Sequence, residues 1–224
     1  MKILGIDTSS RVLSIAFSQD NNVIAREDCL LDRRHSSFLI PKIQGLLDKA
    51  GVSIKEVDGF IVGLGPGSFT GLRIGISAIK GFGIATKKPC VGVPSIDAMA
   101  FNADTDEALI VPIIDAKRGQ IYSAVYRKVK GRIIKQTGYL LMDVARLMKK
   151  IKGPAVFLGD GISLYRQDIE RANKEAVFLG EENWYPKADN LIRLGIKRIK
   201  RYKRPDLGKL EPIYLYPKDC QVRR

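Results

Sequence analysis

The sequence predicts an α/β protein made of two βββαβα lobes, residues 1–104 and 105–224. The same order of strand and helix patterns occurs in both halves, and short motifs recur at matching places. An apolar run ends at Asp7 in the first half and at Asp115 in the second, and Leu64-Gly65-Pro66-Gly67 is matched by Leu158-Gly159-Asp160-Gly161. Ligands of open α/β sheets bind at the carboxyl ends of strands, so we expect a cleft between the lobes that contains Asp7 and Asp115.

The first lobe begins with an antiparallel meander, because short β-branched runs are separated by polar turns. A helix capped by Ser37 follows, with Pro41 at its fourth residue, where an N–H would have no helical partner. A buried strand then leads through a glycine loop into a second helix, capped by Ser68. The expected strands are 1–7, 12–18, 23–31, 60–62 and 90–93, the expected helices are 37–50 and 69–86, and a short segment spans 95–102.

The second lobe repeats this order, and its last segment can pack back on the first lobe. Asp143 is the expected cap of its first helix. The expected strands are 109–114, 120–127, 132–142, 155–158 and 176–179, and the expected helices are 144–152, 163–173 and 188–202.

Charge and composition narrow the class of protein. The net charge is +14. Residues 1–104 contain 12 basic and 10 acidic side chains, whereas residues 105–224 contain 26 and 14. This asymmetry indicates a phosphate-rich partner, with a solvated Lys/Arg face as the alternative. No apolar run approaches the roughly 20 residues of a membrane span. Three scattered cysteines favour the reducing cytoplasm and argue against disulfides or a cysteine zinc site.

The glycine loop does not match a standard nucleotide fingerprint. Its glycines at 65, 67 and 71 have G-x-G-x-x-x-G spacing, and no Lys-Ser or Lys-Thr pair follows at phosphate-loop spacing. The loop either presents backbone amides to a ligand or partner, or forms a tight turn that requires glycine.

The helix over 69–86 has two apolar faces. Leu72, Ile76, Ile79 and Gly83 share one face, while Ile74, Ala78, Gly81 and Ala85 share nearly the opposite one. One face can cover the sheet, and the second, made of smaller residues, suits a neighbouring helix of this chain or of another.

Several motifs together resemble one known family. They are Asp7-Thr8-Ser9-Ser10, His35-Ser36-Ser37 with Pro41, Gly65-Pro66-Gly67-Ser68-Phe69-Thr70-Gly71-Leu72-Arg73-Ile74-Gly75, Asp115-Ala116-Lys117-Arg118-Gly119, Gly159-Asp160-Gly161 and Pro212-Ile213-Tyr214-Leu215. The chain resembles the TsaB (YeaZ) family of the actin, sugar-kinase and heat-shock-chaperone (ASKHA) superfamily. The resemblance implies a duplicated ASKHA fold.

It also implies a cytoplasmic, non-catalytic subunit that forms a dimer with a TsaD-like catalytic subunit and works with a TsaE-like ATPase. Together these proteins place a threonylcarbamoyl group on the adenosine next to the tRNA anticodon, and tRNA is reached through the complex. The related catalytic subunit has a metal-binding histidine pair where this chain has Ser95 and Met99. His35 is the only histidine, so we expect a pseudoenzyme without a metal site and without a required cofactor.

Two carboxylates remain candidates for chemistry. Asp7, Thr8 and Ser9 form a weak candidate site for ATP or ADP, or they simply cap a turn. Asp115 would be the base of an ASKHA phosphotransferase or ATPase that also uses Asp7. Lys117 and Arg118 next to it would lower its pKa, which disfavours that role. For His35 we expect a structural hydrogen bond.

Two surfaces are candidates for partners. The expected partner-binding residues are Pro41, Gln44, Arg73, Ile74, Ser77, Ala78, Gly81 and Ala85, and the same surface can form a homodimer when the partner is absent. The basic segment around Lys197, Arg198, Lys200 and Arg201 either contacts tRNA phosphates or is a solvated helix face. A stand-alone RNA-binding protein is a further alternative.

Overall fold

The computed structural model describes residues 1–31, 35–201 and 207–216, which form two compact units. The first consists of Met1–Ala98 and Pro186–Ile213, and the second of Met99–Tyr185 with the described residues from Tyr214 onward. The division therefore falls six residues before the boundary expected at residue 104, and a late segment of the chain belongs to the first unit. No helix of the described residues combines the length and the apolar character needed to cross a membrane.

The first unit contains a five-stranded sheet with the order β3-β2-β1-β4-β5. Strands β1, β2 and β3 form the predicted antiparallel meander, and β4 and β5 run parallel to β1. The bounds are Lys2–Asp7 for β1, Val12–Gln19 for β2, Asn22–Leu30 for β3, Gly59–Gly63 for β4 and Cys90–Val93 for β5.

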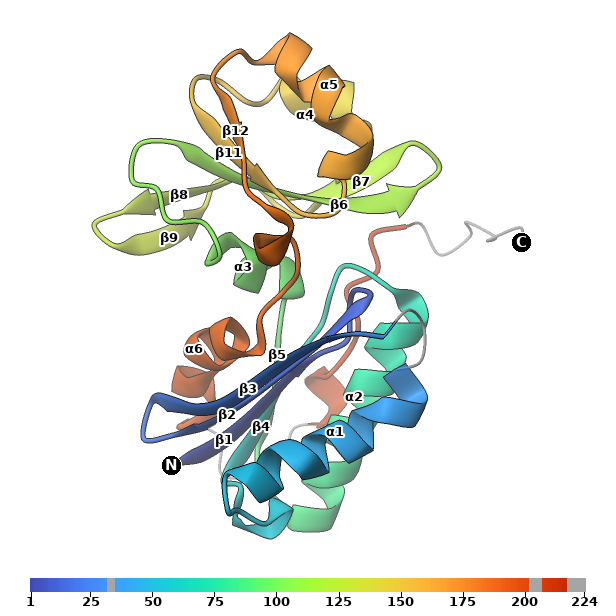
Figure 1. Cartoon of the computed structure of the whole chain (residues 1–224), viewed down its shortest axis with the longest axis vertical. Helices are drawn as coiled ribbons and strands as arrows, with labels where there is room; N and C mark the ends of the chain where they lie inside the picture. The colour runs from blue at the N-terminus through green and yellow to red at the C-terminus, as the bar shows by residue number, and fades with distance from the viewer. Residues whose placement is uncertain (32–34, 202–206, 217–224) are drawn as a thin grey trace. The chain divides into compact units, whose positions relative to one another are not determined.

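Helices cover both faces of this sheet (Figure 1). Helices α1 (His35–Lys49) and α2 (Phe69–Thr86) enclose one core with side chains such as Phe17 and Phe60. Helix α6 (Ala188–Ile199) encloses a second core on the other face, with Ile3 and Ile61. Short helices, α3 (Ser95–Ala100), η1 (Ile54–Glu56) and η3 (Leu207–Lys209), complete the element list.

The predicted bounds of α2 are confirmed. Ser68 Oγ accepts a hydrogen bond from the Gly71 N–H at 3.2 Å, and the helix ends at Thr86, followed by the C-cap residue Lys87, whose φ of 59° is left-handed. The predicted start of α1 was wrong, because the helix begins at His35 and Ser37 lies within it. Pro41 is therefore the seventh residue of α1 and cannot donate to the carbonyl of Ser37.

The second unit repeats the sheet order of the first. Its main path is β10-β7-β6-β11-β12, and β6 is antiparallel to β7 and parallel to β11, as β1 is to β2 and β4. The strands are β6 Leu109–Lys117, β7 Gln120–Ser123, β8 Tyr126–Val129, β9 Arg132–Lys135, β10 Leu140–Met142, β11 Ala155–Leu158 and β12 Ala176–Phe178. The helices are α4 Val144–Met148, α5 Ile162–Ala172 and the short η2 Glu181–Asn183. The duplicated α/β fold is confirmed.

Two strands predicted as continuous are interrupted. Residues 121–123 and 126–127 pair with β6 in one register, but strand pairing is lost at Ala124 and Val125, where the Val125 N–H donates to Thr137 Oγ1 at 3.1 Å. The segment predicted over 132–142 divides into β9 and β10, and Thr137 lies in the interruption between them. A side-chain acceptor thus replaces a ladder partner, an arrangement that alternation of residues does not reveal.

Candidate functional site

Asp7 lies at the carboxyl end of β1, as predicted, but its carboxylate is fully enclosed. Oδ1 accepts hydrogen bonds from the Ser9 N–H at 2.8 Å and the Ser9 hydroxyl at 2.6 Å. Oδ2 accepts a hydrogen bond from the Ser95 hydroxyl at 2.6 Å, and Ser95 Oγ in turn accepts from the Gly65 N–H at 3.0 Å. The carboxylate therefore ties the end of β1 to the glycine loop and to the start of α3.

The glycine loop lies directly against the turn that contains Thr8 and Ser9. The Ser68 N–H donates to the Ser9 carbonyl at 2.7 Å, and the Thr8 hydroxyl donates to the Gly71 carbonyl at 2.7 Å. A Cβ on Gly67 would lie 2.2 Å from the Ser9 carbonyl oxygen, and one on Gly71 would lie 2.0 Å from the Thr8 carbonyl oxygen. The glycines are thus required for contact between two segments of the same chain.

Burial raises the pKa of Asp7, because removal of the carboxylate from water disfavours its charged form. Hydrogen bonds from Ser9 and Ser95 oppose this effect and stabilise the carboxylate. Asp7 is therefore a buried structural carboxylate whose hydrogen-bond donors are Ser9 and Ser95 of the same chain.

The raised pKa of Asp7 predicts a pH-dependent stability. The folded chain binds this proton more tightly than the unfolded chain, so the contribution of Asp7 is fully present below the ordinary aspartate pKa and is lost as the pH rises through the folded-state pKa. Asp7→Asn removes the titration, and the free energy of unfolding of the variant should improve relative to wild type as the pH rises from about 4. Urea unfolding across a pH series measures this, and parallel curves for both proteins would contradict it.

Ser95 and Met99, the positions compared with the histidine pair, are both buried. Ser95 is committed to the hydrogen bonds around Asp7, and Met99 is an apolar side chain of α3. Within the described residues, no group of three His, Cys, Asp or Glu side chains could hold a metal ion. The side chain of His35, and with it the hydrogen bond expected there, lies outside the described part of the chain.

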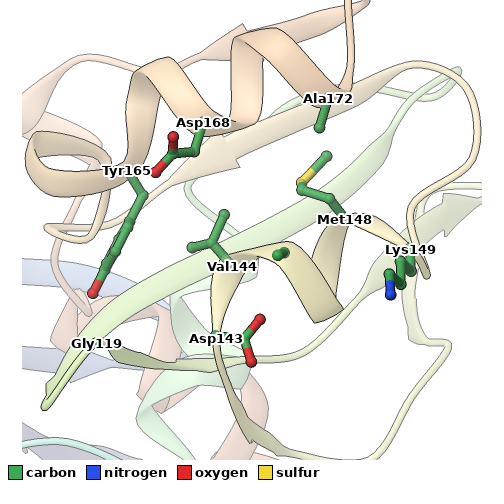
Figure 2. A pocket seen from close by; sticks show the side chains of 9 residues that line it. Gly119, Asp143, Val144, Met148, Lys149, Tyr165, Asp168 and Ala172 are labelled. Carbon is green, nitrogen blue, oxygen red and sulfur yellow. The ribbon is translucent and has the colours of Figure 1, made fainter.

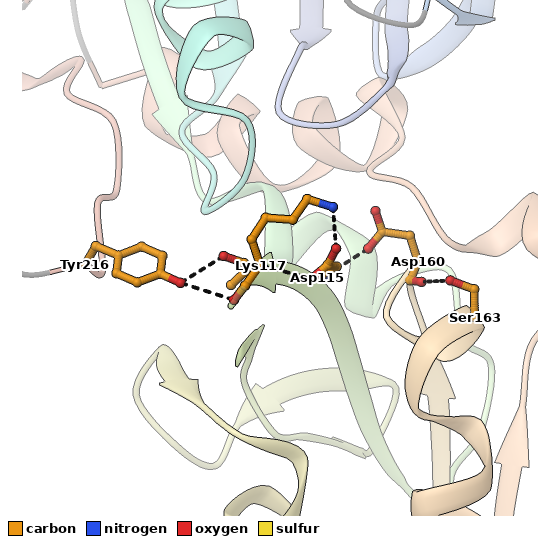
Figure 3. A network of polar contacts seen from close by, with 6 residues as sticks. Asp115, Lys117, Asp160, Ser163 and Tyr216 are labelled. Carbon is orange, nitrogen blue, oxygen red and sulfur yellow. Dashed lines mark hydrogen bonds and ion pairs between the residues drawn. The ribbon is translucent and has the colours of Figure 1, made fainter. Parts of the chain in front are cut away.

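Asp115 lies in β6 of the second unit, two residues before the strand ends (Figure 3). Its carboxylate accepts a hydrogen bond from the Lys117 N–H at 2.8 Å and forms an ion pair with the Lys117 ammonium. The Asp115 N–H donates to Asp160 at 3.0 Å, and the Tyr216 hydroxyl donates to the Ala116 carbonyl at 2.9 Å. These contacts hold the β6–β7 turn, in which Lys117 and Arg118 both have left-handed φ angles of 66° and 56°.

A cavity of about 590 Å³ opens between α4 and α5 of the second unit (Figure 2). Its apolar floor includes Val144 and Met148. Asp143 caps α4 through the Arg146 N–H, and Asp168 forms an ion pair with Arg171. Lys149 and Tyr165 also line the cavity, and burial raises the pKa of Tyr165, so its hydroxyl is protonated near neutrality. No nucleophile and base are paired among the residues that line this cavity.

The surface of α1 and α2 carries the predicted partner-binding residues. Pro41, Gln44, Arg73, Ser77, Gly81 and Ala85 are exposed. Ile74 and Ala78 are half-buried against the core of the first unit, because α1 packs beside α2 and takes part of the predicted face. Four large apolar side chains of α1 and α2 that were not predicted are also exposed: Phe38 at 37%, Ile40 at 50%, Phe69 at 52% and Ile84 at 67%. Helical periodicity did not reveal these exposed apolar side chains, because the helices carry apolar residues on more than one face.

The predicted nucleic-acid residues lie at the end of α6. Lys197, Arg198, Lys200 and Arg201 are exposed, but Arg198 also donates to the Gly92 carbonyl at 2.7 Å. One of the four cations therefore has a structural contact within the first unit. The helix itself ends at Ile199, earlier than the predicted residue 202, which lies outside the described residues.

Sequence comparisons agree with these features of the fold. A family model described as TsaD, tRNA N6-adenosine threonylcarbamoyltransferase, matches residues 29–199. The tRNA threonylcarbamoyladenosine biosynthesis protein TsaB of Bacillus subtilis is 32% identical over 227 residues, which cover 100% of this chain and 97% of that protein. The chain belongs to the TsaB (YeaZ) family.

Solved structures agree with TsaB membership at the level of the fold. YeaZ from Pseudomonas aeruginosa superimposes with a TM-score of 0.77 at 23% identity, covering 96% of this chain and 99% of that one. The ROK hexokinase of Thermus thermophilus has a TM-score of 0.51 at 14% identity over 88% of this chain and all of its own. This TsaB-family chain thus has the ASKHA fold that its sequence predicts.

Proposed function

We propose that this chain is a non-catalytic subunit in tRNA threonylcarbamoyladenosine biosynthesis and pairs with a TsaD-like catalytic subunit. The enclosed carboxylate of Asp7 carries the non-catalytic part of this proposal. Both of its oxygens accept hydrogen bonds from the chain's own Ser9 and Ser95. A carboxylate that binds nucleotide-bound Mg²⁺ must instead present an oxygen to the ion or to its water.

The neighbouring residues support the same conclusion. Thr8 and Ser9, the candidates for phosphate contacts, are buried under the glycine loop. Asp115, the candidate base, is paired with the Lys117 ammonium. We therefore propose that the chain requires no cofactor, that ATP or ADP binds weakly if at all, and that it has no phosphotransferase or metal-dependent activity of its own.

The partner would dock on the α1–α2 face, defined here by Ile40, Arg73, Ser77, Gly81, Ile84 and Ala85. Exposed Ile40 and Ile84 offer apolar side chains, and Ser77, Gly81 and Ala85 allow another helix to approach closely. This composition suits the core of a protein interface better than a solvated surface. Without the partner, two copies would cover the same face in an isologous dimer.

Reconstitution tests the proposed function. The reaction is assembled from tRNA, the TsaD-like subunit, the TsaE-like ATPase and the carbamoyl-adenylate-forming subunit. It is run with and without this chain. We expect modification of the tRNA to require the chain and Asp7→Asn to support it as well as wild type. Equal modification without the chain would refute the proposal. ATP turnover by the isolated chain that is lost in Asp7→Asn would favour the phosphotransferase alternative instead.

A further inference from the structure

A two-stranded hairpin of the second unit carries a concentration of positive charge. Strands β8 and β9 are joined by a tight turn at Lys130 and Gly131, whose φ angles are 50° and 72°. Among the described strands, β9 pairs only with β8, so its outer edge is free. Figure 1 places the hairpin at an end of the second sheet, away from α4 and α5.

The charge of the hairpin is unlike that of the unit around it. Residues 99–185 contain 14 basic and 11 acidic side chains, yet residues 127–135 contain five of those basic side chains and none of the acidic ones. Lys128 is neutralised by ion pairs with Asp104 and Asp106. In the part of the chain that the structure describes, no carboxylate forms an ion pair with Arg127, Lys130 or Arg132.

The pairing register places two of these cations on one face. Arg127 is opposite Ile134 and Val129 is opposite Arg132, and residues directly opposite in an antiparallel pair share a face. The two arginines are thus diagonal neighbours, on the order of 7–8 Å apart. That separation is similar to the separation of successive phosphates along a nucleic-acid strand. Ile134 and Val129 on this face are 45% and 40% exposed.

We propose that the β8–β9 hairpin binds the phosphate backbone of RNA through Arg127, Lys130 and Arg132. Adjacent cations without carboxylate partners repel one another, and a polyanion removes that repulsion. The planar guanidinium groups match phosphate geometry. A protein partner fits this surface less well, because charged residues are depleted from the cores of protein interfaces. The identity of the RNA as tRNA rests on the proposed function above.

The test compares three variants of the full chain, alone and with the TsaD-like subunit, in binding an unmodified tRNA transcript. The triple variant Arg127→Gln, Lys130→Gln, Arg132→Gln should weaken binding roughly tenfold and lower the salt slope of log K by about 2. The control Lys150→Gln, Lys152→Gln, Lys174→Gln removes the same charge from other exposed positions of the unit and should leave both quantities unchanged. A charge-preserving variant, Arg127→Lys with Arg132→Lys, should retain most of the binding.

Several results would overturn the proposal. Unchanged binding in the triple variant would mean that the cations only protect the free edge of β9 from pairing. Equal losses of tRNA affinity in the triple variant and its control would indicate diffuse electrostatic attraction. If the wild-type chain bound no tRNA, alone or with the TsaD-like subunit, the proposal for the hairpin would also be refuted. If the triple variant kept its affinity for tRNA but no longer bound the TsaD-like subunit, the hairpin would be a protein contact. The triple variant is expected to co-purify with the TsaD-like subunit. Failure of the wild-type chain to bind that subunit would count against the docking proposal alone, so the two proposals fail in different measurements.

Discussion

Gly71→Ala is expected to destabilise the chain by about 3 kcal/mol or more. The new Cβ would lie 2.0 Å from the Thr8 carbonyl oxygen, which is backbone and cannot rotate away. The change would force α2 away from the turn after β1 and would break the hydrogen bond from the Thr8 hydroxyl to the Gly71 carbonyl. Urea unfolding monitored by circular dichroism measures the loss.

Gly81→Ala is the matched control on the same helix. Gly81 is exposed, and an added Cβ would have no atom within 4 Å. Since alanine is favoured over glycine inside a helix, this variant should be more stable than wild type by about 0.5–1 kcal/mol. Similar effects at both positions would show that helix propensity, and not contact with the Thr8 turn, governs the response.

Ile84→Glu is expected to weaken binding to the TsaD-like subunit by about 2 kcal/mol or more, which is roughly thirtyfold in Kd. Ile84 is 67% exposed on the α1–α2 face, so a glutamate is tolerated in the free chain but would be desolvated in the complex. Isothermal titration calorimetry with the purified partner gives Kd, and the thermal unfolding of the free variant should match wild type.

Leu164→Glu provides the comparison for this change. Leu164 is 59% exposed on α5 of the second unit. Its substitution also replaces an exposed aliphatic side chain with a carboxylate, but outside the proposed face. Its affinity for the partner should equal that of wild type. If Leu164→Glu weakened binding and Ile84→Glu did not, the docking surface would lie on the second unit. Ile74 and Ala78 are less suitable test positions, because both pack partly against the core.

Local signals in the sequence predicted much of this fold. Ser68 as the cap and the apolar pattern over 69–86 define α2 correctly, because capping and helical periodicity depend on residues close together in sequence. The repeated motifs predicted that both halves contain the same succession of strands and helices, but not the order of strands within each sheet. The start of α1 was misplaced because Ser37 has the side chain of a cap, whereas the helix begins two residues earlier.

The details of the candidate site depend on contacts distant in sequence. Ser95 is 88 residues from Asp7, and nothing in its neighbourhood indicates that its hydroxyl meets that carboxylate. Exposure of Ile84 depends on how α1 lies beside α2, which helical periodicity does not specify. The division of residues 120–127 depends on the hydroxyl of Thr137, contributed by a later segment.

The place of α6 in the first unit has a consequence for the synthesis of this polypeptide on the ribosome. Leu191, Ile192 and Ile199 cover Ile3 and Ile61 on one side of a sheet whose last strand ends at Val93. At ribosomal elongation rates, the intervening residues take on the order of ten seconds to emerge. During that interval the nascent sheet holds an apolar surface that only the later helix will cover, so chaperones that shield such surfaces should engage this polypeptide before its release.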